Sequence, residues 1–329
     1  MPSVLSMPSV LTAALLGRRV VVRSAAGPGR NGPYRDTLGD LIHLDETTAV
    51  LDTRAGRTEL RRSEITLVRL VEPSAAHQLA LEATAARGWR ARTVQTSSDG
   101  WLLRADSGWT GRANSALALR TLRRPLAAAL TEVGDFYREH GLPVQISVPL
   151  PAGAGLDAAL AAAGWSVVDV SDVMTGRLDL MTAVAGMASP AISVEMSASP
   201  STQWLSTARY RGGPLPDGAP ALLERHDHAL FASALTDGRA VGVARGALDD
   251  GWLGITLLDV EQAYRRRGVA SALLRRLAAE ARQRGATRMY VQVSTDNATA
   301  IAVYRALGLH RHHSYVYRSP PPTHRHRPG

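Results

Sequence analysis

The chain has 329 residues, 45% of them hydrophobic, and a formal net charge of +9. Its length allows about two or three domains, its composition is that of a globular protein, and no stretch approaches a transmembrane span. It has no cysteine, which excludes disulfides, a thiolate nucleophile and a cysteine-based metal site. The start of the chain lacks the basic region of a signal peptide. We therefore expect a cytoplasmic protein with no membrane partner and no metal.

The first segment predicts a small β-barrel. Five short runs of strand-forming residues are separated by turn signals such as Ala55-Gly56, and they cover 18–23, 38–44, 49–53, 57–60 and 65–70. Five strands in so short a segment suggest an SH3-like barrel over residues 1–73. Such a barrel binds peptides or nucleic acid, or only packs against the rest of the chain. Nucleic acid is not favoured, because Tyr34 is the only aromatic residue here that could stack on a base.

Residues 74–182 predict an α/β unit that repeats, in degenerate form, the order of elements in the last third of the chain. Helices are expected over 75–87, 125–140 and 156–163, and strands over 100–105, 144–148 and 166–180. Three pairs of segments correspond: Gly100–Leu102 with Gly251–Leu253, Val144–Ser147 with Val291–Ser294, and Gly164-Trp165 with Gly308-Leu309. On this correspondence the segment Thr110–Ser115 follows the first matched strand, where it either holds an anion or lines the groove between the two copies.

The last third opens with a predicted strand, Ile192–Met196, and a surface loop over Tyr210–Pro220. A hairpin is expected through Asp237-Gly238, with strands over 231–236 and 239–247. The domain ends near residue 318, because residues 319–329 are mostly Pro, His and Arg and predict a disordered tail.

A strand, a basic turn and a helix follow. Trp252–Val260 reads as a buried strand and Ala272–Arg282 as an amphipathic helix, with Tyr264–Ser271 between them. The N–H groups at a helix start have no internal partner, and the helix dipole adds positive potential. Gly268 lets a ligand approach the backbone, and three consecutive arginines precede it. The turn therefore predicts a phosphate site, although it lacks the spacing of a P-loop.

A second motif follows at the expected distance. Met289–Val293 predicts another buried strand, and Asn297–Leu309 predicts a helix that Gly308 ends. Together, Arg265-x-x-Gly268-x-Ala270 and Asn297-x-x-Ala300-x-x-x-Tyr304-x-x-x-Gly308 resemble the two signatures of the GNAT superfamily of N-acetyltransferases, with Leu309 in place of the usual Phe. The resemblance covers residues 190–318. With the barrel and the degenerate unit, the chain resembles a bacterial subfamily of these enzymes.

The resemblance implies an α/β (α+β) fold, acetyl-CoA as cosubstrate, and an amine acceptor that is a small molecule or a protein. In the family the first strand pairs with pantetheine through its backbone, the turn holds the pyrophosphate, the Asn positions the cofactor and the Tyr protonates the leaving thiolate. The cofactor-binding residues implied here are Leu258, Asp259, Val260, Arg265, Arg266, Arg267, Gly268, Val269, Ala270, Ser271, Asn297 and Tyr304.

The sequence leaves the identity of the general base undecided. Some relatives carry Glu five residues before the motif Asn, but this position is Gln292, which is a poor proton acceptor. Asp259, with Tyr304 as the acid, is one catalytic candidate. His226, His228 and a chain of water molecules are others. His310, His312 and His313 follow the last helix without a carboxylate nearby in sequence, so they do not predict a metal site.

The function we expect is N-acetyl transfer by direct attack of an amine on acetyl-CoA. The alternative is a regulatory protein that senses acyl-CoA, with a barrel that binds peptide or nucleic acid. Tyr304 favours the enzyme, because sensing requires no proton donor. The sequence does not indicate an oligomeric state.

Overall fold

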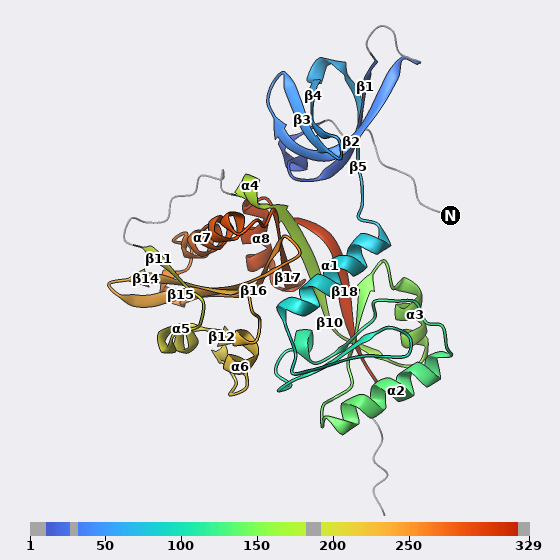
Figure 1. Cartoon of the computed structure of the whole chain (residues 1–329), viewed down its shortest axis with the longest axis vertical. Coiled ribbons are helices and arrows are strands. Elements are labelled where there is room, and N and C mark those ends of the chain that lie inside the picture. The colour runs from blue at the N-terminus through green and yellow to red at the C-terminus, as the bar shows by residue number, and fades with distance from the viewer. Residues whose placement is uncertain (1–10, 27–31, 182–191, 322–329) are drawn as a thin grey trace, which may run out of the picture.

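The computed structural model describes residues 11–26, 32–181 and 192–321. A small N-terminal sheet stands above a much larger sheet that runs through the rest of the molecule (Figure 1). The first ten residues, part of the expected linker near residue 190 and the predicted tail beyond 321 lie outside the described residues.

The N-terminal part is a five-stranded antiparallel sheet in the order β4-β3-β2-β1-β5. Buried aliphatic residues on alternate positions, among them Val20, Val22, Leu41 and Leu51, form its own core. The five predicted strands are confirmed, and closure into an SH3-like barrel stays a prediction. The elements are η1 (Ala13–Leu15), β1 (Arg19–Ala25), β2 (Tyr34–Leu44), β3 (Thr48–Thr53), β4 (Gly56–Arg61), η2 (Arg62–Glu64) and β5 (Ile65–Leu70).

The middle unit follows without a break. Its helices and strands agree with the predicted order, with two additional short strands. They are α1 (Ala75–Gly88), β6 (Thr93–Thr96), β7 (Leu102–Ala105), η3 (Gly111–Ala113), β8 (Ala116–Leu117), α2 (Leu126–Glu139), β9 (Ile146–Leu150), α3 (Ala154–Ala162), β10 (Ser166–Arg177) and α4 (Leu178–Met181).

The C-terminal unit contains the predicted hairpin at Asp237-Gly238, where both residues have positive φ as a tight hairpin requires. Its elements are β11 (Ser193–Ser197), α5 (Thr202–Thr207), β12 (Arg209–Tyr210), β13 (Gly213–Pro214), α6 (Ala219–Glu224), β14 (Ala229–Thr236), β15 (Arg239–Asp249), β16 (Trp252–Val260), η4 (Gln262–Tyr264), α7 (Val269–Gln283), β17 (Arg288–Ser294), α8 (Ala298–Ala306) and β18 (His310–Ser319).

One 11-stranded sheet joins the two units, in the order β11-β14-β15-β16-β17-β10-β18-β9-β8-β7-β6. The last strands are exchanged: β10 of the middle unit pairs with β17, and β18 of the C-terminal unit pairs with β9. Each unit therefore completes its sheet with a strand of the other, and β10 and β18 also pair with each other at the centre.

The sheet order corrects the repeat that the sequence suggested. In the C-terminal unit, α7 crosses between the parallel strands β16 and β17; in the middle unit, α2 crosses between the parallel strands β8 and β9. Strand β16 therefore corresponds to β8, not to β7, so the match of Gly100–Leu102 with Gly251–Leu253 was wrong. The turn that corresponds to the basic turn is the segment before α2, residues 118–125, rather than Thr110–Ser115.

The two faces of the sheet differ around β17. Met289, Val291 and Val293 pack with α7 and α8. The alternate residues Tyr290 and Gln292 face the other way, and Tyr290 packs with Leu81 and Ala85 of α1. On that second face α5 and α6 pack close to the end of α1.

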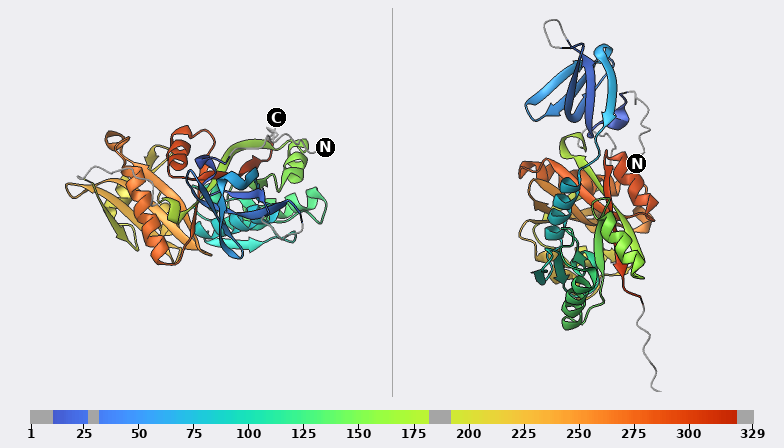
Figure 2. Two further views of the ribbon diagram at one scale, coloured as in Figure 1. Left: turned by 90° about the horizontal axis from the view of Figure 1, so that it is seen from above. Right: turned by 90° about the vertical axis from the view of Figure 1, so that its right-hand side faces the viewer.

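The N-terminal sheet lies against the end of the large sheet at which β10 ends and β17 begins (Figure 2). Asp40 and Asp52 of the N-terminal sheet pair with Arg288 and Arg177 at 2.9 and 2.7 Å. The contact is polar, and it lies at the strand ends.

Candidate active site

The large sheet opens between β16 and β17. Trp252–Ile255 pairs with Arg288–Val291 in parallel, and the two strands then separate. Among the described residues, the edge of β16 over 256–260 that faces β17 has no strand partner, which leaves its backbone groups available to a ligand. Leu258, Asp259 and Val260 lie in this stretch, where the sequence placed the pantetheine contact.

The basic turn brings the backbone to the start of α7. Gly268 is the N-cap residue with φ 79°, and Arg266 also has a left-handed φ of 60°. Gly268 has no side chain that could accept a helix N–H, and the first turn of α7 holds no acidic residue. The N–H groups of Val269, Ala270 and Ser271 thus start a 15-residue helix with a positive potential and no capping side chain. This arrangement fits a pyrophosphate.

The three arginines of the turn differ in their contacts. The Nε of Arg265 donates to the Val260 carbonyl at 3.0 Å, so this side chain ties the turn to β16. The guanidinium of Arg267 lies over the ring of Tyr264 at 5.5 Å. All three arginines remain exposed and keep the turn positive.

Helix α8 carries the second motif. Asn297 is its N-cap, and its Oδ1 accepts from the Ala300 N–H at 3.1 Å. The helix ends as predicted: Gly308 has φ 83°, and the N–H of Leu309 donates to the Tyr304 carbonyl, which is the bond of a Schellman motif. Asn297 therefore fixes the start of α8, and the amide nitrogen of its exposed side chain can still reach a ligand.

Tyr304 is 7% exposed and packs in the core that α7 and α8 share. Burial raises the pKa of its phenol to about 12, and the positive charge of Arg112 partly offsets that rise. The hydroxyl is therefore protonated at neutral pH and able to donate.

Arg112 comes from η3 of the middle unit, and its Nη2 donates to the Gln292 carbonyl at 2.8 Å. Gln292 is the first residue of β17 beyond the pairing with β16. Burial disfavours the charge on Arg112, but the phenols of Tyr315 and Tyr317 outweigh it, so the pKa of Arg112 lies above its ordinary value. Arg112 of the segment Thr110–Ser115 thus contacts the C-terminal unit where β16 and β17 separate, and the expectation that this segment lines a groove between the copies stays a prediction.

Asp259 is half-buried on β16. Burial raises the pKa of its carboxyl, and the backbone N–H groups of Arg209 and Val260 oppose the rise. His226 is less suited to accept a proton. Its Nε2 pairs with Asp249 at 2.7 Å and its Nδ1 accepts the His228 N–H at 3.1 Å, which leaves no free lone pair.

A carboxylate that the sequence reasoning missed lies beside Gln292. Glu82 of α1 is 3% exposed, and its Oε2 is 3.4 Å from the Gln292 amide nitrogen. Its Oε1 is 3.0 Å from Nε2 of His313, a fully buried ring on β18. The two partners are separated by more than 200 positions in sequence, so no local pattern could have joined them.

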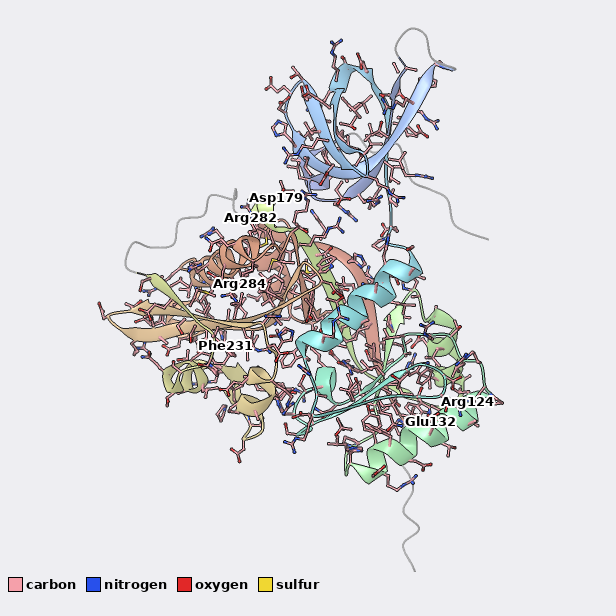
Figure 3. The ribbon with its side chains drawn as sticks, viewed as in Figure 1. Arg124, Glu132, Asp179, Phe231, Arg282 and Arg284 are labelled. Carbon is pink, nitrogen blue, oxygen red and sulfur yellow. The ribbon has the colours of Figure 1, made fainter. Side chains whose placement is uncertain are left out.

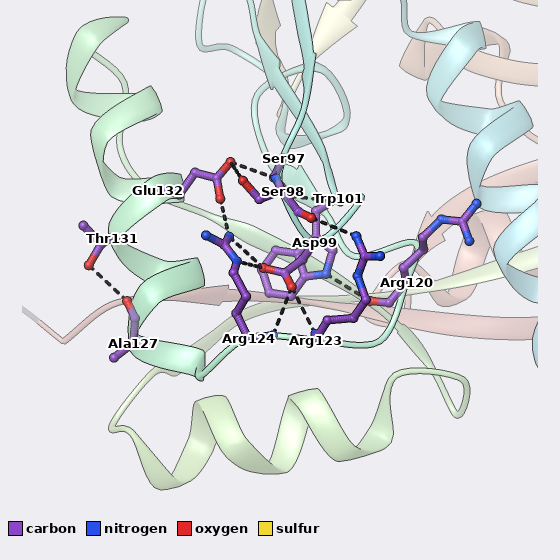
Figure 4. A network of polar contacts seen from close by, with 10 residues as sticks. All are labelled: Ser97, Ser98, Asp99, Trp101, Arg120, Arg123, Arg124, Ala127, Thr131 and Glu132. Atoms are coloured by element: carbon purple, nitrogen blue, oxygen red, sulfur yellow. Dashed lines mark hydrogen bonds and ion pairs between the residues drawn. The ribbon is translucent and has the colours of Figure 1, made fainter.

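The corresponding turn of the middle unit is occupied by the protein itself (Figure 4). The Oδ1 of Asp99 accepts the backbone N–H groups of Arg123 and Arg124 at 3.0 and 3.3 Å. The Arg124 guanidinium binds the other oxygen of Asp99 at 2.7 Å and also contacts Glu132. The Asp99 side chain is 1% exposed. This carboxylate binds the turn at two N–H groups that directly precede Pro125, the N-cap residue of α2.

The turn before α2 and the basic turn before α7 lie in different units. Figure 3 shows Arg124 and Glu132 on the middle unit and Arg282 and Arg284 at the C-terminal end of α7, in the C-terminal unit. Within residues 11–26, 32–181 and 192–321, no group of three or more His, Asp or Glu side chains could hold a metal ion. No helix in those ranges has the length and apolar character to cross a membrane.

A family model described as "Probable histone acetyltransferase Rv0428c C-terminal" matches residues 76–318. The chain belongs to this family. It is 30% identical over 314 residues to the Mycobacterium tuberculosis protein named "Probable histone acetyltransferase Rv0428c", covering 92% of this chain and 94% of that protein. It is also 28% identical to the Bacillus subtilis "Uncharacterized N-acetyltransferase YobR", covering 72% of this chain and 98% of that one.

Two solved structures share the fold of this GNAT-superfamily protein. A GCN5-related N-acetyltransferase from Kribbella flavida superimposes with a TM-score of 0.56 at 16% identity, covering 75% of this chain and 97% of that one. A tandem GNAT protein from the clavulanic acid biosynthesis pathway gives 0.55 at 16% identity, covering 77% and 91%. The chain is an acetyl-CoA-dependent N-acetyltransferase, and the interpretation of its middle unit as a degenerate GNAT-like repeat stays a prediction.

Proposed function

We propose that this enzyme transfers the acetyl group of acetyl-CoA to an amine by direct attack, with Tyr304 as the proton donor to the leaving thiolate. The observation that carries the proposal is the buried phenol of Tyr304, which interacts electrostatically with Arg112, the residue that binds the Gln292 carbonyl where β16 and β17 separate. A thioester supplies an activated acetyl carbon when acetyl-CoA is bound. The residues of the chain then orient the thioester, remove a proton from the amine and give a proton to the leaving thiolate.

The binding roles follow from the backbone. The N–H groups of Gly268 to Ser271 and the exposed guanidinium of Arg266 would hold the pyrophosphate. The unpaired edge of β16 at Leu258 to Val260 would pair with the amides of pantetheine. Asn297 would contact the cofactor through its amide nitrogen while its oxygen caps α8.

The proton roles follow from burial and charge. With a pKa raised to about 12, the phenol of Tyr304 is protonated when the thiolate leaves, and Arg112 favours the phenolate that remains. Burial also raises the pKa of Asp259 on β16, which the sequence offered as one of several candidates for the base. No cysteine is present, so the reaction has no thioester intermediate on the enzyme.

A screen tests this function. Acetyl-CoA should raise the melting temperature of the purified full chain, because a ligand that binds only the folded state stabilises it. Thiol release should then be measured over a panel of small amines, polyamines and lysine-bearing peptides; the name of the M. tuberculosis relative is the reason to include histone-tail peptides. Amine-dependent thiol release with an acetylated product supports the proposal. Stabilisation without transfer to any amine would favour the acyl-CoA sensor instead.

A further inference from the structure

The opening in the sheet is connected to the surface by a short chain of titratable groups. It begins at Glu82, whose Oε2 faces Gln292 and whose Oε1 contacts His313. It continues from Nδ1 of His313 to Nδ1 of His312 at 2.8 Å. Glu82 and His313 are buried, whereas His312 is half-buried. The chain therefore leads from the interior outward.

The position of Glu82 compensates for a missing group. Residue 292 is Gln, and its amide cannot accept a proton at neutral pH. The structure places a carboxylate of another element within 3.4 Å of that amide, on the face of the sheet opposite α7 and α8. The pyrophosphate turn and Tyr304 belong to the α7 and α8 face. An amine that approaches from the α1 face would thus meet the thioester from the side on which Glu82 lies.

We propose that Glu82 is the general base that takes the proton of the acceptor ammonium, directly or through one water molecule, and that His313 and His312 connect it to the solvent. This inference rests on the proposed function, since it requires an amine acceptor. It assigns the base to a helix outside residues 190–318, to which the sequence had limited the GNAT motifs.

The protons balance. Glu82 takes one proton from the ammonium, which frees the nitrogen lone pair to attack the acetyl carbon. The C–N bond forms and the C–S bond breaks; Tyr304 gives its proton to the thiolate, and the phenolate recovers one from the acetylated nitrogen. The proton on Glu82 then passes through His313 and His312 to the solvent, which restores the Glu82 carboxylate. The net products are the amide, CoA thiol and one released proton.

Neighbouring groups support this direction of transfer. Burial, together with the charges of His313, His77 and Arg288, lowers the pKa of His312 to about 3, so this ring passes a proton on rather than retaining it. The phenols of Tyr290 and Tyr317 also face Glu82, and burial raises the pKa of both.

The test compares two acceptors with matched variants of the full chain. The first acceptor is the alkylamine with the highest turnover in the screen, which is an ammonium at pH 7. The second is its β-difluorinated analogue, and both are assayed at about pH 8.5, where the alkylamine is still an ammonium but the fluorinated amine is largely neutral and needs no base to expose its lone pair. The variants are Glu82→Gln, His312→Asn and, as a control, Glu132→Gln, which removes a carboxylate of the middle unit that lies near Asp99.

Glu82→Gln should lower kcat/KM for the alkylamine by about 100- to 10,000-fold, the usual contribution of a general base, but for the fluorinated amine by less than about tenfold. His312→Asn should give a smaller loss with the alkylamine only. The half-buried position of His312 makes this the second test if Glu82→Gln fails to fold. Glu132→Gln should leave both reactions unchanged.

The outcomes are distinguishable. Equal losses with both amines would mean that Glu82 only supports the structure, and wild-type rates with both would remove it from the mechanism. Either result overturns this inference and leaves acetyl transfer standing. If the wild-type enzyme acetylates no amine, the proposed function fails, and this inference fails with it.

Discussion

At the scale of the residue, acetyl-CoA binding in the proposed site depends most directly on Gly268. Its φ of 79° suits glycine, and it caps a helix whose first turn has no acidic side chain. Gly268→Glu would place a carboxylate where the pyrophosphate should lie. We predict that it weakens acetyl-CoA binding by at least about 100-fold, about 2.7 kcal/mol, in calorimetry.

The control for this variant is Gly285→Glu. Gly285 follows the other end of α7, has φ 85° and opens onto free space, so the substitution carries the same backbone strain and the same charge. It should bind acetyl-CoA as the wild type does. Unchanged affinity in Gly268→Glu would remove the basic turn from the cofactor site.

Protonation of the leaving thiolate depends, in the proposed mechanism, on the hydroxyl of Tyr304. Tyr304→Phe keeps the ring and removes the proton donor, so kcat should fall about 10- to 1000-fold with little change in acetyl-CoA affinity. Because the pKa of the phenol is raised to about 12, the effect should be constant between about pH 6 and pH 9. Tyr137→Phe, which removes another buried phenol in the middle unit, is the control. Equal turnover of Tyr304→Phe and wild type would make Tyr304 a packing residue.

At the scale of the element, the turn before α2 explains how the middle unit differs from the C-terminal one. Both turns are basic and both start a helix, but Asp99 already accepts the N–H groups of Arg123 and Arg124. The Arg124 guanidinium lowers the pKa of the Asp99 carboxyl. The internal ion pair stabilises the fold in place of a ligand.

Asp99→Asn should therefore lower stability at pH 7. A depressed carboxyl pKa contributes stability above its unfolded value, about 3.9, and this contribution is lost as the pH falls through the folded pKa. The difference between the urea midpoints of wild type and variant should be present at pH 7 and shrink below about pH 4. A difference that does not depend on pH would indicate a packing effect instead.

Local signals in the sequence predicted the elements that are built from neighbouring residues. The β14–β15 turn at Asp237-Gly238, strand β16 and the end of α8 at Gly308 all follow from residue type and spacing. The five N-terminal strands were also predictable, because each is bounded by turn residues.

The sequence did not predict the strand pairings and side-chain contacts between distant parts of the chain. Strand β8 has only two residues, too few for an alternating pattern, and missing it shifted the repeat by one strand. The exchange of β10 and β18 has no local signature, because both strands keep their length and only change neighbours. Arg112 and Glu82 enter the candidate site from the middle unit and from α1 through contacts that span 180 and 210 positions.

At the scale of the whole molecule, the two GNAT-like units act as one body. The exchanged strands place the middle unit against the opening of the C-terminal unit, where Arg112 reaches Gln292. In the proposed function, the middle unit contributes Arg112 to the candidate site. The N-terminal sheet is held at the far end by Arg177 and Arg288, away from the basic turn, and its role as a barrel that binds a partner stays a prediction.

The central claim is that one chain has one acetyl-CoA site, at the start of α7. Native mass spectrometry with saturating acetyl-CoA tests it most directly, in the wild type and in Gly268→Glu. We predict one acetyl-CoA per wild-type chain and none in the variant, because Asp99 occupies the second turn. Two acetyl-CoA molecules per wild-type chain, or one that survives Gly268→Glu, would contradict the account.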